Sequence, residues 1–147
     1  MYKKLFVPVD GSELSHRAMD GSIALAKQLG ASITGFVVEP EVPITAAGSR
    51  TQPLLERIKD NDSKNEAHAA ALLGQFENRA TAQGVDFHAH HVTAFQVDNA
   101  IVEEAEKLNC DMIVMTTHGR SKLGELFFGS RTHDVVIASS LPVLVLR

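Results

Sequence analysis

The feature that most constrains the fold of this chain is the regular alternation of short apolar runs with longer amphipathic segments. Five runs have the length, apolar content and flanking turn residues of strands. They are residues 4–9, 33–38, 85–92, 111–116 and 142–146. Strands that alternate with helices are joined by right-handed crossovers, so they pair in parallel and are covered on both faces. We therefore predict an α/β fold, a single domain with a doubly wound, five-stranded parallel sheet.

Four helices are expected between these strands. They are expected over residues 12–30, 53–83, 97–108 and 130–139. Asp10-Gly11-Ser12 is a turn and helix N-cap signal, and Gly30 stands where a left-handed residue commonly ends a helix. The segment opened by Glu39-Pro40 and Pro43 contains small residues, and its length suggests a mobile flap.

Two of the strands differ in their chemistry. Residues 85–92 contain His88, His90 and His91, which indicates an edge strand. Two same-face histidines do not complete a metal site, and no acidic or cysteine partner lies at ligand spacing, so the metal interpretation is disfavoured. Residues 111–116 form the most hydrophobic run, and we expect that strand to lie centrally.

Composition excludes several classes of function. The chain has 147 residues, 44% of them hydrophobic, which suits one domain spanning 1–147. A net charge of −4 provides no positive field for nucleic acid or for an anionic membrane. The apolar run before Asp10 is too short for a signal peptide or a membrane span, so we expect a cytoplasmic protein. The single cysteine, Cys110, suits a reducing compartment and is most simply a small core residue.

The strand order predicts where a ligand would bind. In doubly wound sheets, ligands bind beyond the carboxyl ends of the strands where the strand order reverses. If the order is 3-2-1-4-5, that point lies between the first and fourth strands. The unusual loop chemistry follows these two strands, as Asp10-Gly11-Ser12 and as the segment from Thr116 to Ser130.

The second of these segments has the chemistry of a phosphate loop. Gly119 and Gly129 are separated by nine residues, and Ser130 opens a helix. Glycine lets main-chain N–H groups approach an anion, and a helix N-terminus adds free donors with a partial positive charge. The Walker pattern fails because Gly129 is followed by Ser130-Arg131, and a GxGxxG fingerprint is absent. The sequence therefore favours a phosphate-binding loop that belongs to neither of those two motifs.

These residues resemble the universal stress protein family. Members carry V-D-G-S at the end of the first strand and G-x2-G-x9-G-(S/T) after the fourth. Here Val9-Asp10-Gly11-Ser12 matches the first pattern, and the run from Thr116 to Ser130 matches the second with threonine in place of its first glycine. The resemblance extends to the V-V-E-P segment and the terminal L-P-V-L-V-L segment, and so covers nearly the whole chain.

The resemblance implies a site for ATP, ADP or AMP. Asp10 would contact the ribose or the metal region, the main chain at Val37 would contact adenine, and Pro8 and Val9 would flank the base. The residues implied around the phosphates and the adjoining loop are Met115, Thr116, His118, Gly119, Arg120, Gly129, Ser130, Arg131 and Thr132. Mg²⁺ or Mn²⁺ would bridge the phosphates and be held mainly by them, and no catalytic residue is assigned.

Alternatives remain for individual residues. Asp10 also suits simple helix capping. A loop-shaping role for His118 outranks catalysis because no nucleophile or matched base is evident beside it. A side chain at Thr116 can restrict the backbone and crowd a ligand, or its hydroxyl can act as a donor.

Three functions follow in order of preference. The first is a regulatory nucleotide-binding module with at most slow ATP hydrolysis, the second an ATP-consuming enzyme such as an adenylyl or phosphoryl transferase, and the third an interaction protein without a nucleotide. The apolar strand 142–146 is an edge strand that a second copy would cover, so we also expect a homodimer.

Overall fold

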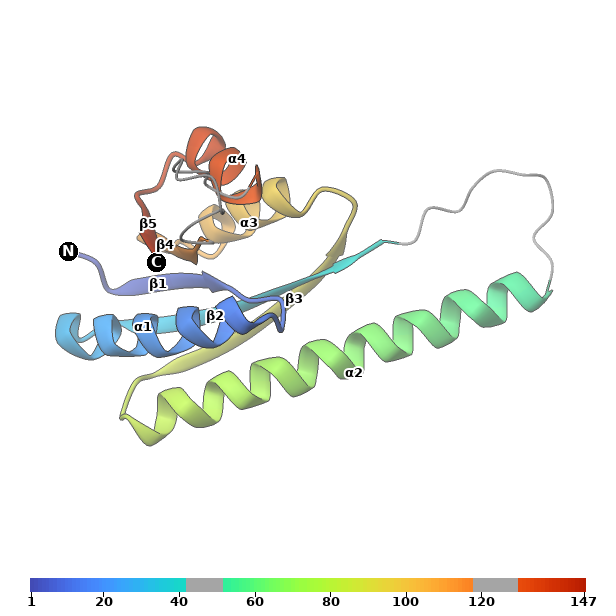
Figure 1. The fold of residues 1–147 in the computed structure, drawn as a ribbon, viewed down its shortest axis with the longest axis horizontal. Coiled ribbons are helices and arrows are strands. Elements are labelled where there is room, and N and C mark those ends of the chain that lie inside the picture. Colours follow the sequence, from blue (N-terminus) through green and yellow to red (C-terminus); the bar gives the residue numbers. More distant parts are fainter. Residues whose placement is uncertain (42–51, 118–129) are drawn as a thin grey trace, which may run out of the picture.

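The computed structural model describes residues 1–41, 52–117 and 130–147 (Figure 1). Strands and helices alternate along the chain. In chain order the elements are β1 (Lys4–Pro8), α1 (Glu13–Leu29), β2 (Ser32–Pro40), α2 (Gln52–Ala82), β3 (Phe87–Ala94), α3 (Val97–Lys107), β4 (Met112–Thr116), α4 (Ser130–Ala138) and β5 (Val143–Leu146). The strands form one parallel sheet in the order β3-β2-β1-β4-β5. The predicted single α/β domain and its strand order are confirmed.

Helices cover both faces of the sheet, with α1 and α2 on one face and α3 and α4 on the other (Figure 1). Side chains alternate along each strand and so build two separate cores. Leu5 and Val7 pack towards α1 and α2. Phe6, between them, packs towards α3 and α4 beside Phe36, with 4.8 Å between the ring centroids. Both faces of β1 are therefore buried, as expected for the middle strand of a doubly wound sheet.

Two helix ends follow local sequence signals. Gly30 has φ of 60° and donates its N–H to the carbonyl of Ala26, so it is the left-handed residue that ends α1. Ser12 is the N-cap residue of α1, but its side chain makes no capping hydrogen bond. The predicted turn is therefore present, and other side chains organise it.

β2 is longer than predicted. It continues through Glu39 and Pro40 because its pairing with β3 persists as far as Ala94. The loop expected to open at Glu39-Pro40 therefore begins later, and the proposed flap lies outside the described residues.

α2 extends well beyond the sheet. Its buried residues all lie in its second half: Ala69, Leu72, Leu73, Phe76 and Ala80. The first half projects away from the domain (Figure 1). The first half of this helix is therefore mostly exposed to solvent.

The edge position of β3 is confirmed. His88 and His91 are exposed, as predicted for an edge strand. His90 differs, because its Nε2 lies 2.6 Å from Glu104 Oε2 of α3 and its ring stacks on Phe36. No cluster of three or more His, Cys, Asp or Glu side chains suited to a metal occurs within 1–41, 52–117 and 130–147.

Cys110 is buried just before β4, and burial raises the pKa of its thiol. It is a core residue, as predicted. Among the helices of the described ranges, none is both long enough and apolar enough to cross a membrane.

Candidate functional site

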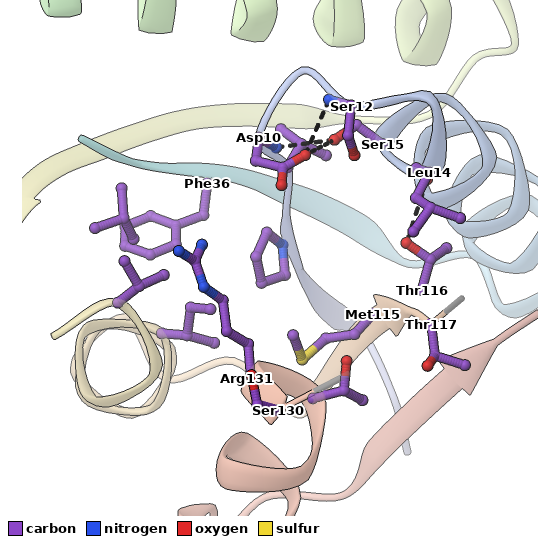
Figure 2. A pocket seen from close by; sticks show the side chains of 16 residues that line it. Asp10, Ser12, Leu14, Ser15, Phe36, Met115, Thr116, Thr117, Ser130 and Arg131 are labelled. Atoms are coloured by element: carbon purple, nitrogen blue, oxygen red, sulfur yellow. Dashed lines mark hydrogen bonds between the residues drawn. The ribbon is translucent and has the colours of Figure 1, made fainter. Parts of the chain in front are cut away.

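A cavity of about 330 Å³ opens at the carboxyl ends of β1 and β4, where the strand order reverses (Figure 2). This is the position predicted for a ligand site in a doubly wound sheet. The predicted residues that line it are Pro8, Val9, Asp10, Met115, Thr116, Ser130, Arg131 and Thr132. The tertiary structure thus brings together residues from β1, β4 and α4. His118, Gly119, Arg120 and Gly129 lie outside the described residues.

Val37 is the predicted site residue whose side chain does not line this cavity. It is buried in the core towards α1 and α2. Its neighbours Phe36 and Val38 line the cavity instead. Strand alternation explains the difference, since residues on either side of Val37 face the opposite side of the sheet. The main-chain contact predicted at Val37 stays a prediction.

One part of the cavity is apolar. Phe36 and Val38 of β2 face Val97 and Ile101 of α3 across it, and Met115 of β4 contributes as well. Sequence analysis missed the two α3 residues because nothing in their local pattern distinguishes a cavity wall from a core. The alternation of side chains between the two faces of β2 is the signal from which Phe36 and Val38 could have been predicted.

The turn after β1 is organised by Ser15, a buried residue of α1 that sequence analysis also missed. Its Oγ accepts the N–H groups of Asp10 at 2.8 Å and of Gly11 at 3.1 Å. The same hydroxyl donates to Asp10 Oδ1 at 2.8 Å. Ser15 therefore holds both the main chain and the side chain of the turn, as Figure 2 shows.

Asp10 also accepts the N–H of Ser12 on Oδ1 at 3.0 Å. The capping interpretation is thus correct in part, because the carboxylate binds the N-cap residue of α1. Burial acts to raise the pKa of Asp10, but the hydrogen bonds from Ser12 and Ser15 and the positive charge of Arg131 lower it overall. Asp10 is therefore ionised at neutral pH and faces the cavity as an anion.

Thr116 lies at the end of β4, and its hydroxyl contacts α1. Oγ1 donates a hydrogen bond of 3.2 Å to the main-chain carbonyl of Leu14. The hydroxyl is thus a donor, and its acceptor is the protein. Crowding of a ligand by this side chain stays a prediction. Thr116 also lines the cavity.

The first turn of α4 closes the polar part of the cavity. Ser130 and Arg131 are exposed, whereas Thr132 is buried. The leading N–H groups of a helix lack intrahelical acceptors and carry a partial positive charge. Hydroxyl and N–H donors therefore stand opposite Asp10, in a cavity whose other part is apolar.

The fold and the cavity define a doubly wound α/β protein with a ligand-sized pocket at the switch point of its sheet. Comparison with known families agrees with the resemblance drawn from the motifs. The model of the universal stress protein family matches residues 1–147, and the chain belongs to that family.

Relatives in this family are similar over most of their lengths. Universal stress protein MJ0531 of Methanocaldococcus jannaschii is 31% identical over 150 residues, covering 100% of this chain and 83% of the relative. The solved structure of protein MJ0577 from the same organism superposes with a TM-score of 0.80 at 26% identity, covering 99% of this chain and 96% of the other. A universal stress protein solved in complex with cAMP superposes with a TM-score of 0.71 at 23% identity, covering 99% and 97% of the two chains.

Proposed function

We propose that this protein is a regulatory module that binds ATP or a closely related adenine nucleotide in the cavity beyond β1 and β4. The observation that carries the proposal is that the cavity combines apolar side chains with hydroxyl groups, Asp10 and Arg131. A nucleotide presents the same two kinds of surface, in an aromatic base and a polar sugar phosphate. Small-molecule sites commonly combine an apolar lining with a few convergent polar groups.

Each part of the nucleotide has suitable residues. Phe36 and Ile101 offer apolar surface to the base. The Asp10 carboxylate is an acceptor for the ribose hydroxyl groups. Ser130 and Thr132, with the first turn of α4, supply donors for phosphate oxygens. The predicted contributions of Gly119 and Gly129 remain part of the proposal.

Relatives support the same class of ligand. A universal stress protein of the same fold has been solved with cAMP, which is an adenine nucleotide. At 23% identity that likeness shows the fold alone, so the assignment of a ligand to this chain rests on its own cavity residues.

Location in the cytoplasm stays a prediction.

A divalent cation fits this site only together with the phosphates. Asp10 is the one acidic residue among the described residues that line the cavity. Mg²⁺ is commonly bound by one or two carboxylates with substrate phosphates and water, so a single carboxylate is compatible with it. Mg²⁺ or Mn²⁺ would neutralise phosphate charge beside Asp10.

Binding is tested by calorimetric titration of ATP, ADP and AMP in excess Mg²⁺. We expect saturable binding, and weaker binding by Asp10→Ala because the ribose loses its acceptor. Asp60→Ala on the exposed part of α2 is the matched control and should bind as the wild type does. Absence of saturable binding to the wild type at millimolar nucleotide would remove the proposal. Mass spectrometry of nucleotide carried through native purification provides an independent check.

We further propose a homodimer that pairs along strand 142–146. β5 is an edge strand whose four residues are all partly exposed, and α4 beside it exposes 71% of Ile137. An uncovered apolar edge strand tends to pair with another chain. Light scattering should show a dimer for the wild type and a monomer for Val145→Lys. His91→Lys places the same charge on the opposite sheet edge and should stay dimeric, whereas a monomeric wild type would contradict the proposal.

A further inference from the structure

A histidine and a glutamate form a polar pair behind the apolar part of the cavity. Nε2 of His90, on β3, lies 2.6 Å from Oε2 of Glu104, on α3. Burial acts to raise the pKa of Glu104, but hydrogen bonds from His90 and Lys107 lower it overall, so Glu104 is a carboxylate at neutral pH. A carboxylate can only accept hydrogen bonds, so the histidine Nε2–H donates, and the bond is of the strong, charge-assisted kind.

His90 contacts one wall of the cavity through Phe36. The two residues are register partners in β3 and β2, and their rings stack with 5.6 Å between centroids and 19° between planes. On the other neighbouring strand, Phe6 of β1 contacts the same ring, with 4.8 Å between centroids. The ring of Phe36 therefore has an aromatic neighbour on each adjoining strand, and His90 is the one that also bonds to a helix.

Glu104 belongs to the helix that forms the opposite wall. Val97, Ile101 and Glu104 are spaced four and three residues apart, so they follow one face of α3. Val97 and Ile101 line the cavity, whereas the side chain of Glu104 is directed to His90 and is only 13% exposed. The hydrogen bond between His90 and Glu104 therefore joins the two walls, one through Phe36 and the other through α3.

Apolar contact alone does not fix the distance between these walls. The hydrophobic effect is non-directional, and it favours moving apolar surfaces together until the water between them is expelled. A hydrogen bond, in contrast, keeps its two atoms within a narrow range of lengths and angles. The pair can therefore hold α3 at a set spacing from β2 before a ligand binds. A site that is already in its binding geometry loses less conformational freedom on binding and so has the higher affinity.

We propose that His90 and Glu104 are positioning residues that set the width of the apolar part of the cavity, and so its affinity for a planar base. This inference rests on the proposed nucleotide function and adds two residues to it. Neither of them touches the ligand, because His90 acts through Phe36 and Glu104 acts through Ile101 on the same helix.

The test replaces the pair by two apolar side chains, in the double variant His90→Phe with Glu104→Met. Exchange of a largely buried, charged pair for well-packed apolar groups is often neutral or stabilising. Phenylalanine also keeps a ring beside Phe36. We therefore expect the free energy of unfolding, measured by urea denaturation, to equal or exceed that of the wild type. Calorimetric titration should nevertheless show about tenfold weaker binding of AMP, because the spacing of the walls is no longer fixed.

The two single variants complete a double-mutant cycle. Each leaves one polar group of the pair without its partner, so each should be less stable than the double variant. AMP affinity should fall by a similar factor in all three variants, because each change breaks the same hydrogen bond. Stability is thus recovered in the double variant and affinity is not, whereas a purely structural role would make the two change together.

His88→Phe with Glu103→Met is the matched control. It makes the same two substitutions on the same strand and the same helix, at exposed positions, and should bind AMP as the wild type does. If His90→Phe with Glu104→Met is unfolded by circular dichroism, Glu104→Gln takes its place. Glutamine keeps the length of the side chain but removes its charge, so AMP should bind about threefold more weakly.

Three results would overturn this inference and leave the proposed function standing. They are wild-type AMP affinity in the folded variants at His90 and Glu104, affinity that recovers together with stability in the double variant, and an equal loss of affinity in the control. A wild type that binds no AMP, ADP or ATP would overturn the proposed function and this inference together.

Discussion

The hydroxyl of Thr116, the last residue of β4, donates a hydrogen bond of 3.2 Å to the carbonyl of Leu14 in the first turn of α1. The two residues are 102 positions apart in the chain. The bond joins the ends of two elements that both line the cavity. It therefore ties the geometry of the site to the packing of α1 on the sheet.

We expect Thr116→Val to destabilise the protein by about 1 kcal/mol, because valine keeps the shape but cannot donate to Leu14. For a domain of this size, a loss of that amount lowers Tm by about 2–4 °C. Thr116→Ser retains the hydroxyl and should lose less. Thermal unfolding followed by circular dichroism measures both variants. Equal stability of the wild type and Thr116→Val would show that this hydrogen bond is not made in solution.

The turn after β1 should depend on Ser15 more than on other serines of α1. Ser15→Ala removes one hydrogen bond to Asp10 Oδ1 and the acceptor for two main-chain N–H groups. We expect a loss of about 2 kcal/mol in the free energy of unfolding, since two partly buried donors lose their acceptor. Nucleotide affinity should fall with it, because Asp10 is no longer held.

Ser22→Ala is the matched control for this prediction. Ser22 is also buried in α1, but its hydroxyl donates only to Met19 in the same helix. Urea denaturation and ATP titration of both variants provide the comparison. A Ser22→Ala variant that weakens ATP binding as much as Ser15→Ala would argue against a specific role for Ser15.

Gly35 lies where a side chain has no room. A Cβ atom at this position would stand 2.4 Å from Cζ of Phe87 and 3.0 Å from Cδ1 of Phe76. We predict that Gly35→Ala costs about 2–3 kcal/mol, as overpacking of a filled core does. Adding Phe87→Leu should recover part of the loss by removing the contacted ring atoms. Denaturant midpoints of the single and double variants measure this recovery.

Gly74→Ala should behave in the opposite way. Apart from the backbone of α2 itself, nothing lies within 4 Å of a Cβ at this position, and Gly74 is inside α2. Replacing a helical glycine by alanine stabilises a helix by about 1 kcal/mol. If both alanine variants destabilise the protein equally, the packing around Gly35 is not the cause.

The free energy of unfolding should fall in acid, partly because Asp111 becomes protonated. Its Oδ2 accepts the N–H groups of Lys3 at 2.7 Å and Lys4 at 2.8 Å, and these bonds hold the pKa of the carboxyl group below its ordinary value. Because this pKa is lower in the folded protein than in the unfolded chain, ionised Asp111 stabilises the fold fully at pH values above its pKa in the unfolded chain. That stabilisation is lost as the pH falls through the pKa of Asp111 in the folded protein.

The stability difference between the wild type and Asp111→Asn should therefore be constant near neutral pH and shrink below about pH 4. Urea denaturation at a series of pH values measures it. Because Asp111 lies outside the cavity lining, ATP affinity at neutral pH should not change. A stability difference that is independent of pH would contradict the role given to these hydrogen bonds.

Much of the architecture could be predicted from local patterns. Each strand of the sheet was recognised by its apolar run, and the histidines of β3 correctly indicated an edge. The predicted ends of strands were less accurate where pairing with a neighbouring strand extends the strand. β2 reaches Pro40 because β3 continues beside it, and no local signal reports the length of a partner strand.

The site was predicted only where its chemistry leaves a local signature. Asp10 and Ser130 follow recognisable turn and helix signals, and both line the cavity. Phe36 and Val97 carry no such signature, because an apolar residue in a cavity wall and one in a core look alike in sequence. Ser15 was missed for a related reason, since its partners are defined by how α1 turns away from β1.

The sequence by itself determined the order of the elements along the chain and the parallel sheet, because these follow from hydrophobic periodicity and the handedness of crossovers. Given the strand order, it also predicted which two strand ends would border a cavity. Only the tertiary structure decided which side chains meet at that place. The strand pleat turns Phe36 and Val38 into the cavity and Val37 into the opposite core. In the same way, packing of α1 against β4 brings Thr116 to Leu14, a contact that depends on two elements far apart in the chain.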